Sequence, residues 1–235
     1  MSITNTSEDE GLLYLLQAAT SAFPTGAFSH SFGFETLIDE GAVTDGDSLE
    51  RCSALWLRYG VATADAAVCA WAWLAADAND EALLGILDEQ LNALRITRET
   101  RQASLSTGTA FMNAARDAFG GDGLARYRAL VGEGACGGHY ATAFGVAGHD
   151  AGISRHSTTV AFLHGSLSSL ISVAARIIPL GQVATQRIIS NARPAILDCA
   201  RIALGTGLMD LGTSTAWFDH ASMAHERLYS RLCIS

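Results

Sequence analysis

The sequence contains no lysine, and all 15 of its basic residues are arginines. This absence excludes the phosphate-binding lysine of a P-loop, a Schiff-base lysine and a lysine general base. The GxSxG elbow of many hydrolases is also missing. A GxGxxG match at residues 132–137 follows no predicted strand, so we interpret it as a connection between helices. The chain is therefore predicted to be non-catalytic.

Charged residues are scarce, at 17% of the chain, whereas hydrophobic residues make up 49%. This leaves less polar surface than usual, and we expect some apolar surface to meet a partner. The 24 acidic residues outnumber the basic ones and give a net charge of -9. Such a charge argues against nucleic acid or an anionic membrane as a partner and favours a basic protein or cations.

The 5 cysteines form no CxxC pair and are odd in number, which predicts reduced thiols. Residues 1–10 are polar and acidic, without the basic and apolar regions of a signal peptide. These features predict a cytoplasmic protein with a flexible N-terminal tail at residues 1–10.

Strand-like alternation is essentially absent, and helical periodicity dominates the chain. Asp47 and Glu50 resemble a capping box, and the apolar stripe after them implies about 27 helical residues. Pro179 should end a central helix, and Pro194 should interrupt a later one. The fold class is therefore all-α: a single-domain bundle, covering residues 11–235, of roughly eight to ten helices. Further helices are expected near residues 12–23, 79–94, 105–119, 138–149, 160–177, 182–203 and 217–232.

One stretch, residues 157–175, carries no formal charge and approaches the length of a membrane span. Its five serines and one histidine would be costly in lipid. We therefore expect a buried helix of the bundle and no membrane contact.

The segment at residues 23–35 combines turn-forming residues with four phenylalanines between two helical patterns. Pro24 fixes one backbone angle and Gly26 permits a sharp turn. The four rings need apolar partners, either within the protein or on another one. We interpret this segment as a packed surface rather than a plain loop.

Five blocks of the sequence, in order, are similar to the signature blocks of the urease accessory protein family UreF. The first spans residues 12–35, and the last lies at the C-terminus with His225, Glu226, Tyr229 and Arg231. The blocks between them are residues 98–104, residues 140–145, and residues 179–182 with Gln186.

The resemblance implies a urease maturation chaperone that bridges a nickel-delivering GTPase (UreG-like) and a second accessory protein (UreD/UreH-like) to apo-urease. It implies support of GTP-dependent nickel insertion, a homodimer, and nickel handled by the complex without a stably bound cofactor. Residues 217–235 are predicted to dock the second accessory protein and to lack order alone. The predicted partner-binding or interface residues are Pro24, Gly26, Phe28, Ser29, His30, Ser31, Glu35, Arg98, Glu99, Arg101, Gln182, Gln186, His225, Glu226, Tyr229 and Arg231.

Two local patterns leave alternatives open. Arg98, Glu99 and Arg101 form either a solvated helix start, with Arg95 and Glu99 as an i,i+4 pair, or a buried or interfacial network. His225 lies on an apolar stripe, which favours a hydrogen-bonded core or interface histidine.

A direct nickel carrier is the alternative function. Cys136 and His139 have ligand-like spacing, and His149 follows soon after. Thiolate and imidazole suit nickel, although the region lacks the second ligand pair of a closed site. We predict no stable metal site here.

Overall fold

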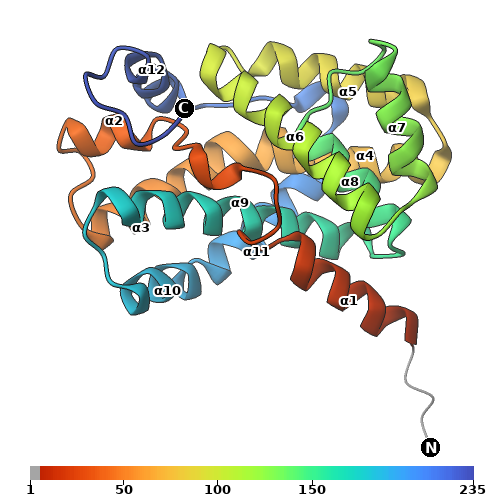
Figure 1. Cartoon of the computed structure of the whole chain (residues 1–235), viewed down its shortest axis with the longest axis horizontal. Helices are drawn as coiled ribbons and strands as arrows, with labels where there is room; N and C mark the ends of the chain where they lie inside the picture. The colour runs from red at the N-terminus through yellow and green to blue at the C-terminus, as the bar shows by residue number, and fades with distance from the viewer. Residues whose placement is uncertain (1–5) are drawn as a thin grey trace, which may run out of the picture.

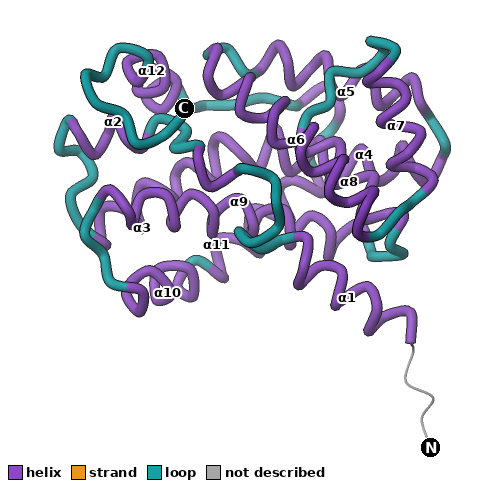
Figure 2. Tube along the Cα trace, in the orientation of Figure 1, coloured by secondary structure: helices purple, strands orange, loops and turns teal. Residues whose placement is uncertain are grey.

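The computed structural model describes residues 6–235, and all regular structure within that range is helical (Figure 1 and Figure 2). The predicted all-α, single-domain bundle is confirmed. Its α-helices are α1 (Thr6–Ala18), α2 (Phe34–Asp39), α3 (Gly46–Trp56), α4 (Ala66–Ala78), α5 (Glu81–Leu94), α6 (Arg98–Ala118), α7 (Asp122–Gly132), α8 (Tyr140–Asp150), α9 (Arg155–Ile177), α10 (Gln182–Asn191), α11 (Arg193–Gly205) and α12 (Ala216–His225).

The long apolar stripe after residue 45 becomes a continuous helical rod in which α3, the π-helix η2 (Leu57–Asp65) and α4 follow without a break. Asp45 is its N-cap: its carboxylate accepts from the Ser48 N–H at 2.8 Å, and Ser48 Oγ accepts from the Asp45 N–H at 3.0 Å. The predicted capping box of Asp47 and Glu50 is therefore wrong by two positions. The rod ends at Asn79, which adopts a left-handed φ of 53°.

The centre of the core is the packing of α4 against α8 and α9, with α6 across α8. Gly145 allows the close approach of α8, because a Cβ at this position would collide with the carbonyl oxygen of Cys69. Aromatic rings fill the adjoining space: Phe144 lies 5.5 Å from Phe111 and 5.7 Å from Phe162 between ring centroids. These contacts are apolar.

The uncharged stretch at residues 157–175 falls within α9, which is long and apolar enough to cross a membrane by length and composition. In this structure α9 packs against α4, α8 and α11 and ends before Pro179, as expected. The predicted interruption near Pro194 is also confirmed. It lies between α10 and α11, and Pro194 takes the first turn of α11, where its missing N–H needs no partner.

Two helices, α2 and α7, were not predicted from the sequence. The six residues of α2 are too few to show a periodic pattern. The start of α7 is capped by a residue distant in sequence: the Asp150 carboxylate accepts from the N–H groups of Gly123 at 3.1 Å and Leu124 at 2.7 Å. No local motif could reveal that cap.

At both ends of the chain the helix bounds differ from the predicted ones. Residues 1–5 lie outside the described part, and α1 begins at Thr6, within the predicted tail at residues 1–10. The flexibility of that tail stays a prediction. At the other end α12 stops at His225, seven residues before the predicted boundary. The remaining residues, 226–235, are called the tail below.

The tail folds back onto the first family block instead of extending the helix. The Ile234 N–H donates to the Ser29 carbonyl at 2.8 Å, and the Ser31 N–H donates to the Ser235 carbonyl. Cys233 and Ser235 are buried, with 7% and 2% exposure. These contacts tie the segment to the bundle in this structure, and its predicted lack of order in the isolated protein stays a prediction.

Candidate partner-docking site

Four side chains from distant parts of the sequence meet beneath the tail: Glu35, Glu99, His225 and Arg231. His225 lies between two carboxylates, with Nε2 2.9 Å from Oε2 of Glu35 and Nδ1 2.7 Å from Oε2 of Glu99. Arg231 Nη1 donates to the other oxygen of Glu99 at 3.0 Å. The His225 side chain is fully buried, and both carboxylates are nearly so. We call these four residues the carboxylate–histidine cluster.

The helix ends explain why these residue types lie where they do. Glu35 and Glu99 occupy the first turns of α2 and α6, where the helix dipole favours a negative charge. His225 occupies the last turn of α12, where the dipole favours a positive one. Thr97 caps α6 and also lies 3.1 Å from Ser222 of α12, measured between the hydroxyl oxygens, which fixes the two helices together.

Glu35 also holds the backbone of the tail. Its two oxygens accept hydrogen bonds from the N–H groups of Leu232 at 2.6 Å and Cys233 at 3.0 Å. Burial acts to raise the pKa of Glu35, but the hydrogen bonds from Leu232, His225 and Cys233 together bring it below its ordinary value. Glu35 is therefore an ionised acceptor on which the tail is fastened.

An exposed ion pair borders the cluster. Arg98 Nη2 lies 3.0 Å from Oε2 of Glu226, and the Arg98 side chain is 78% exposed. Arg101, the third member of the predicted network, instead reaches the Ile96 carbonyl at 3.5 Å. The buried network thus contains Glu99, whereas both arginines remain on its rim.

A cleft of about 610 Å³ opens beside the cluster, between the first family block, α6 and the tail. His30 helps to close it, with Nδ1 2.8 Å from the Ser235 hydroxyl, and burial lowers the pKa of this histidine. Six of its lining residues were predicted interface residues: Gly26, Ser29, His30, Glu99, Arg98 and Arg231.

Apolar side chains of the tail face solvent. Tyr229 is fully exposed, and Leu232 and Ile234 are 74% and 68% exposed. Leu232 and Ile234 point outward because their neighbours Cys233 and Ser235 take the inward positions of the extended segment. Phe28, in the first family block, is also more than half exposed. Of the four rings predicted to need partners, this one lies most open to solvent.

The remaining predicted residues lie elsewhere. Ser31 is buried in the contact with the tail, and Pro24 is exposed in the same block. Gln182 and Gln186 are exposed on α10, a helix that Figure 1 places well apart from α12. The structure therefore divides the predicted set between the tail region and a second surface on α10.

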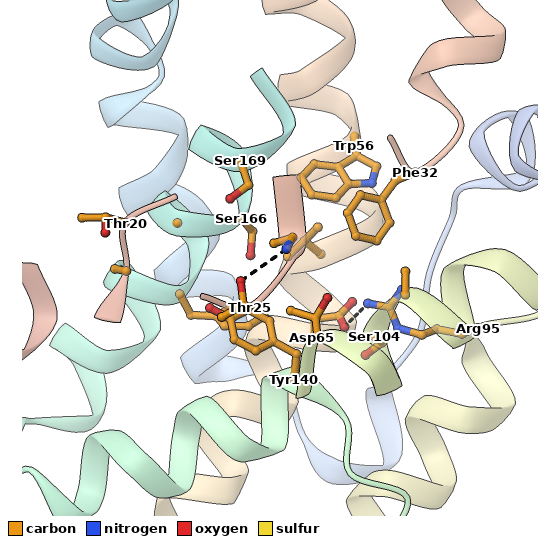
Figure 3. Close-up of a pocket in the computed structure, with 17 residues that line it drawn as sticks. Thr20, Thr25, Phe32, Trp56, Asp65, Arg95, Ser104, Tyr140, Ser166 and Ser169 are labelled. Atoms are coloured by element: carbon orange, nitrogen blue, oxygen red, sulfur yellow. Dashed lines mark hydrogen bonds and ion pairs between the residues drawn. The ribbon is translucent and has the colours of Figure 1, made fainter. Parts of the chain in front are cut away.

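A buried ion pair between Asp65 and Arg95 was missed. The predicted pairing of Arg95 with Glu99 is wrong, because α5 ends before Arg95 and a new helix begins at Arg98. Figure 3 shows the pair at the wall of a cavity of about 60 Å³ together with several Ser, Thr and Tyr hydroxyl groups. Asp65 is the last residue of the π-helix, and no local pattern of residues indicates either the π-helix or the ion pair.

The residues of the proposed nickel carrier each have other surroundings. His139 is fully buried, 2.9 Å from the Ser104 hydroxyl, and burial lowers its pKa to about 3. His149 faces Asp77 at 3.4 Å, and burial raises the pKa of the Cys136 thiol to about 11. Among the described residues, no group of three or more His, Cys, Asp or Glu side chains could hold a metal ion.

Comparison with known proteins connects this geometry to a family. The UreF family model matches residues 43–193. The chain belongs to the UreF family. It is 36% identical to a urease accessory protein UreF of Rhodopseudomonas palustris (strain TIE-1), over 96% of this chain and 92% of that protein. It is 32% identical to the UreF of Geobacillus kaustophilus (strain HTA426), over 97% of this chain and 99% of that protein. Membership of the UreF family supports a role in urease maturation.

Proposed function

We propose that this protein is a non-catalytic adaptor in urease maturation. It would bridge a nickel-delivering GTPase of the UreG type and a second accessory protein of the UreD/UreH type to apo-urease. In this role it supports GTP-dependent nickel insertion, works in the cytoplasm as a homodimer and holds no resident cofactor, since nickel is the cargo of the complex.

The single observation that carries this proposal is the docked tail. Leu232 and Ile234 are directed to solvent by a backbone that is itself fixed on Glu35 and on the Ser29 carbonyl. Exposed apolar groups on an ordered segment lose little conformational entropy on binding. The tail is therefore a preorganised surface for the second accessory protein.

The surface on α10 is proposed as a separate contact. Gln182 and Gln186 lie one helical turn apart on its exposed side, and Val183 beside them is 85% exposed. Two separate surfaces are what a bridging protein needs, because each can be occupied while the other remains free. We assign the tail to the second accessory protein and α10 to the GTPase.

Size-exclusion chromatography with light scattering tests the proposal. The protein is run alone, with each accessory protein separately, and with both in the presence of GTP analogue. The adaptor function predicts a ternary complex whose mass contains all three proteins. Elution of this chain apart from both partners under every condition would contradict it.

A further inference from the structure

The floor of the cleft beside the carboxylate–histidine cluster is one face of α6. Its residues follow each other at steps of four, which places them on the same side of the helix: Arg98, Gln102, Ser106 and Ala110. At about 1.5 Å per residue these four positions span about 18 Å. An extended chain of about five or six residues has the same length, at about 3.3 Å per residue. The cleft is therefore long enough for an extended segment of a protein.

The walls of the cleft come from two segments that lie far apart in the sequence. The first family block contributes Thr25, Gly26 and Ser29, and the tail contributes Arg231 and Ile234. Ile234 is 68% exposed, so it offers an apolar contact at the edge of the cleft. A segment bound along α6 would therefore also contact the tail, the surface that we assign to the second accessory protein.

Positive charge is in excess at the end of the cleft where α6 begins. The exposed carboxylate of Glu226 accepts a hydrogen bond from Arg98, which lowers its pKa most, and the charges of Arg227 and Arg231 lower it further. Arg231 also pairs with Glu99, but Arg227 is exposed and has no carboxylate partner among the described side chains. In a chain with a net charge of -9, this end of the cleft has the opposite sign.

We propose that the cleft binds an extended, acidic segment of the second accessory protein, with its carboxylates at Arg98 and Arg227. The inference rests on the proposed function and adds the chemistry of the segment that is recognised. A guanidinium group can hold a carboxylate through two parallel hydrogen bonds. Because the Arg98 side chain is 78% exposed, it can exchange Glu226 for a carboxylate of the partner without any change in the buried cluster.

Two features favour an acidic protein segment over a small anion. Beyond the arginine the floor offers an amide, a hydroxyl and a methyl group, which suit the backbone and side chains of a peptide. The carboxylate of Glu99 also borders the cleft and opposes a compact dianion such as phosphate more than a single carboxylate. A second copy of this chain is the rival occupant, because Asp9 and Glu10 of its α1 are exposed.

The absence of lysine from the chain allows a direct test. Arg98→Lys keeps the charge and introduces a single side-chain amine at the cleft, and Glu226→Gln removes the nearest carboxylate of the chain itself. Carbodiimide coupling then joins that amine to any carboxylate in contact with it. Arg126→Lys with Glu226→Gln is the matched control, because Arg126 is an exposed arginine of α7 outside the cleft.

Both variants are coupled in the mixture with the second accessory protein, and the products are mapped by mass spectrometry. We expect an amide bond between residue 98 and an aspartate or glutamate of the second accessory protein. No such bond should form through residue 126 in the control.

A second measurement compares rates of association with the second accessory protein. Arg98→Gln with Arg227→Gln should slow association by about tenfold at low salt. The control, Arg126→Gln with Arg128→Gln on α7, changes the net charge equally and should slow it by no more than about twofold. The difference should vanish at about 1 M salt, where charges act over only about 3 Å.

If the complex forms, the absence of a bond through residue 98 or equal rates in the two double variants would overturn the inference and leave the adaptor function standing. A bond from residue 98 to a second copy or to the GTPase would overturn it by identifying another occupant. Failure of the wild type to bind the second accessory protein would overturn both. If the coupling variant does not fold, the rates of the glutamine variants decide the question.

Discussion

The centre of the bundle and the tail are held by different kinds of contact. Between α4, α8 and α9 the contacts are small side chains and aromatic rings such as Phe144 and Phe162. The tail is instead held by hydrogen bonds to Glu35 and by the ion pair of Arg231 with Glu99, and both carboxylates also contact His225. The first region is held by neutral groups, including Cys69 and Tyr140, whose pKa values are raised by burial, whereas the tail depends on the carboxylates of Glu35 and Glu99.

The two regions therefore have different roles: the centre stabilises the fold, and the tail carries the surface that we propose for binding. Apolar packing responds weakly to pH and salt, while buried charged hydrogen bonds change sharply with the protonation of any member. The bundle can therefore stay folded while the tail docks and undocks. Conditions that leave the core intact should alter the surface that we assign to the second accessory protein.

The largest effect is expected from a change in the centre. Phe144→Ala removes a ring that is 1% exposed and leaves a cavity among its aromatic neighbours. The free energy of unfolding should fall by about 3–5 kcal/mol. Urea denaturation measures this value. Phe28→Ala, at a half-exposed ring, is the control and should change it by much less; equal losses would mean that the centre is not the stabilising region.

A change at the tail should give a smaller and local effect. Glu35→Gln replaces one acceptor oxygen by an amide nitrogen that must face either the Leu232 N–H or the donors of Cys233 and His225, so the tail should lose part of its anchor. Hydrogen exchange at the Leu232 and Ile234 amides should accelerate by about tenfold or more, while core amides of α4 remain protected.

Glu40→Gln, at the exposed end of the same helix, is the control for that experiment. Its tail amides should exchange as in the wild type. If Glu35→Gln instead unfolds the whole protein, the tail and the centre are one cooperative unit and the comparison fails.

Acid should reproduce the effect of Glu35→Gln. The pKa of Glu35 is lowered in the folded protein despite its burial, so its contribution is complete above its ordinary range and is lost as pH falls through the lowered value. Tail protection should therefore decline in acid before core protection does. Hydrogen exchange measured across the acidic range checks this order. Loss of tail protection and core protection at the same pH would contradict it.

The smallest effect is expected at the rim. Arg98→Gln breaks an ion pair with Glu226 in which the arginine is largely exposed. Such pairs are screened by water and salt, so tail protection should stay at the wild-type level. A loss comparable to that of Glu35→Gln would show that the rim, rather than the buried cluster, holds the tail.

Helical periodicity was sufficient for the long elements. It predicted the rod that includes α4 and the central helix α9, while the missing N–H of Pro194 predicted the interruption between α10 and α11. Features set by distant residues were not predictable. α7 is capped by Asp150, and Arg95 pairs with Asp65 rather than with its neighbour Glu99, because spatial partners override local spacing.

The site was predicted only as a set of residues. Glu35, Glu99 and His225 were each named, yet no local pattern could show that the two carboxylates lie on either side of the buried His225 imidazole. The tail was misjudged because helical spacing continues past His225, whereas the hydrogen bonds of Leu232 and Cys233 to Glu35 draw the chain into an extended path.

The most direct test of the docked tail as the binding surface is the affinity for the second accessory protein, measured by titration calorimetry. Leu232→Ser with Ile234→Ser removes exposed apolar groups without touching the buried cluster. Leu197→Ser, at a half-exposed leucine on α11, is the control. The account predicts a loss of about tenfold or more for the tail variant and none for the control. Full affinity in the tail variant would contradict it.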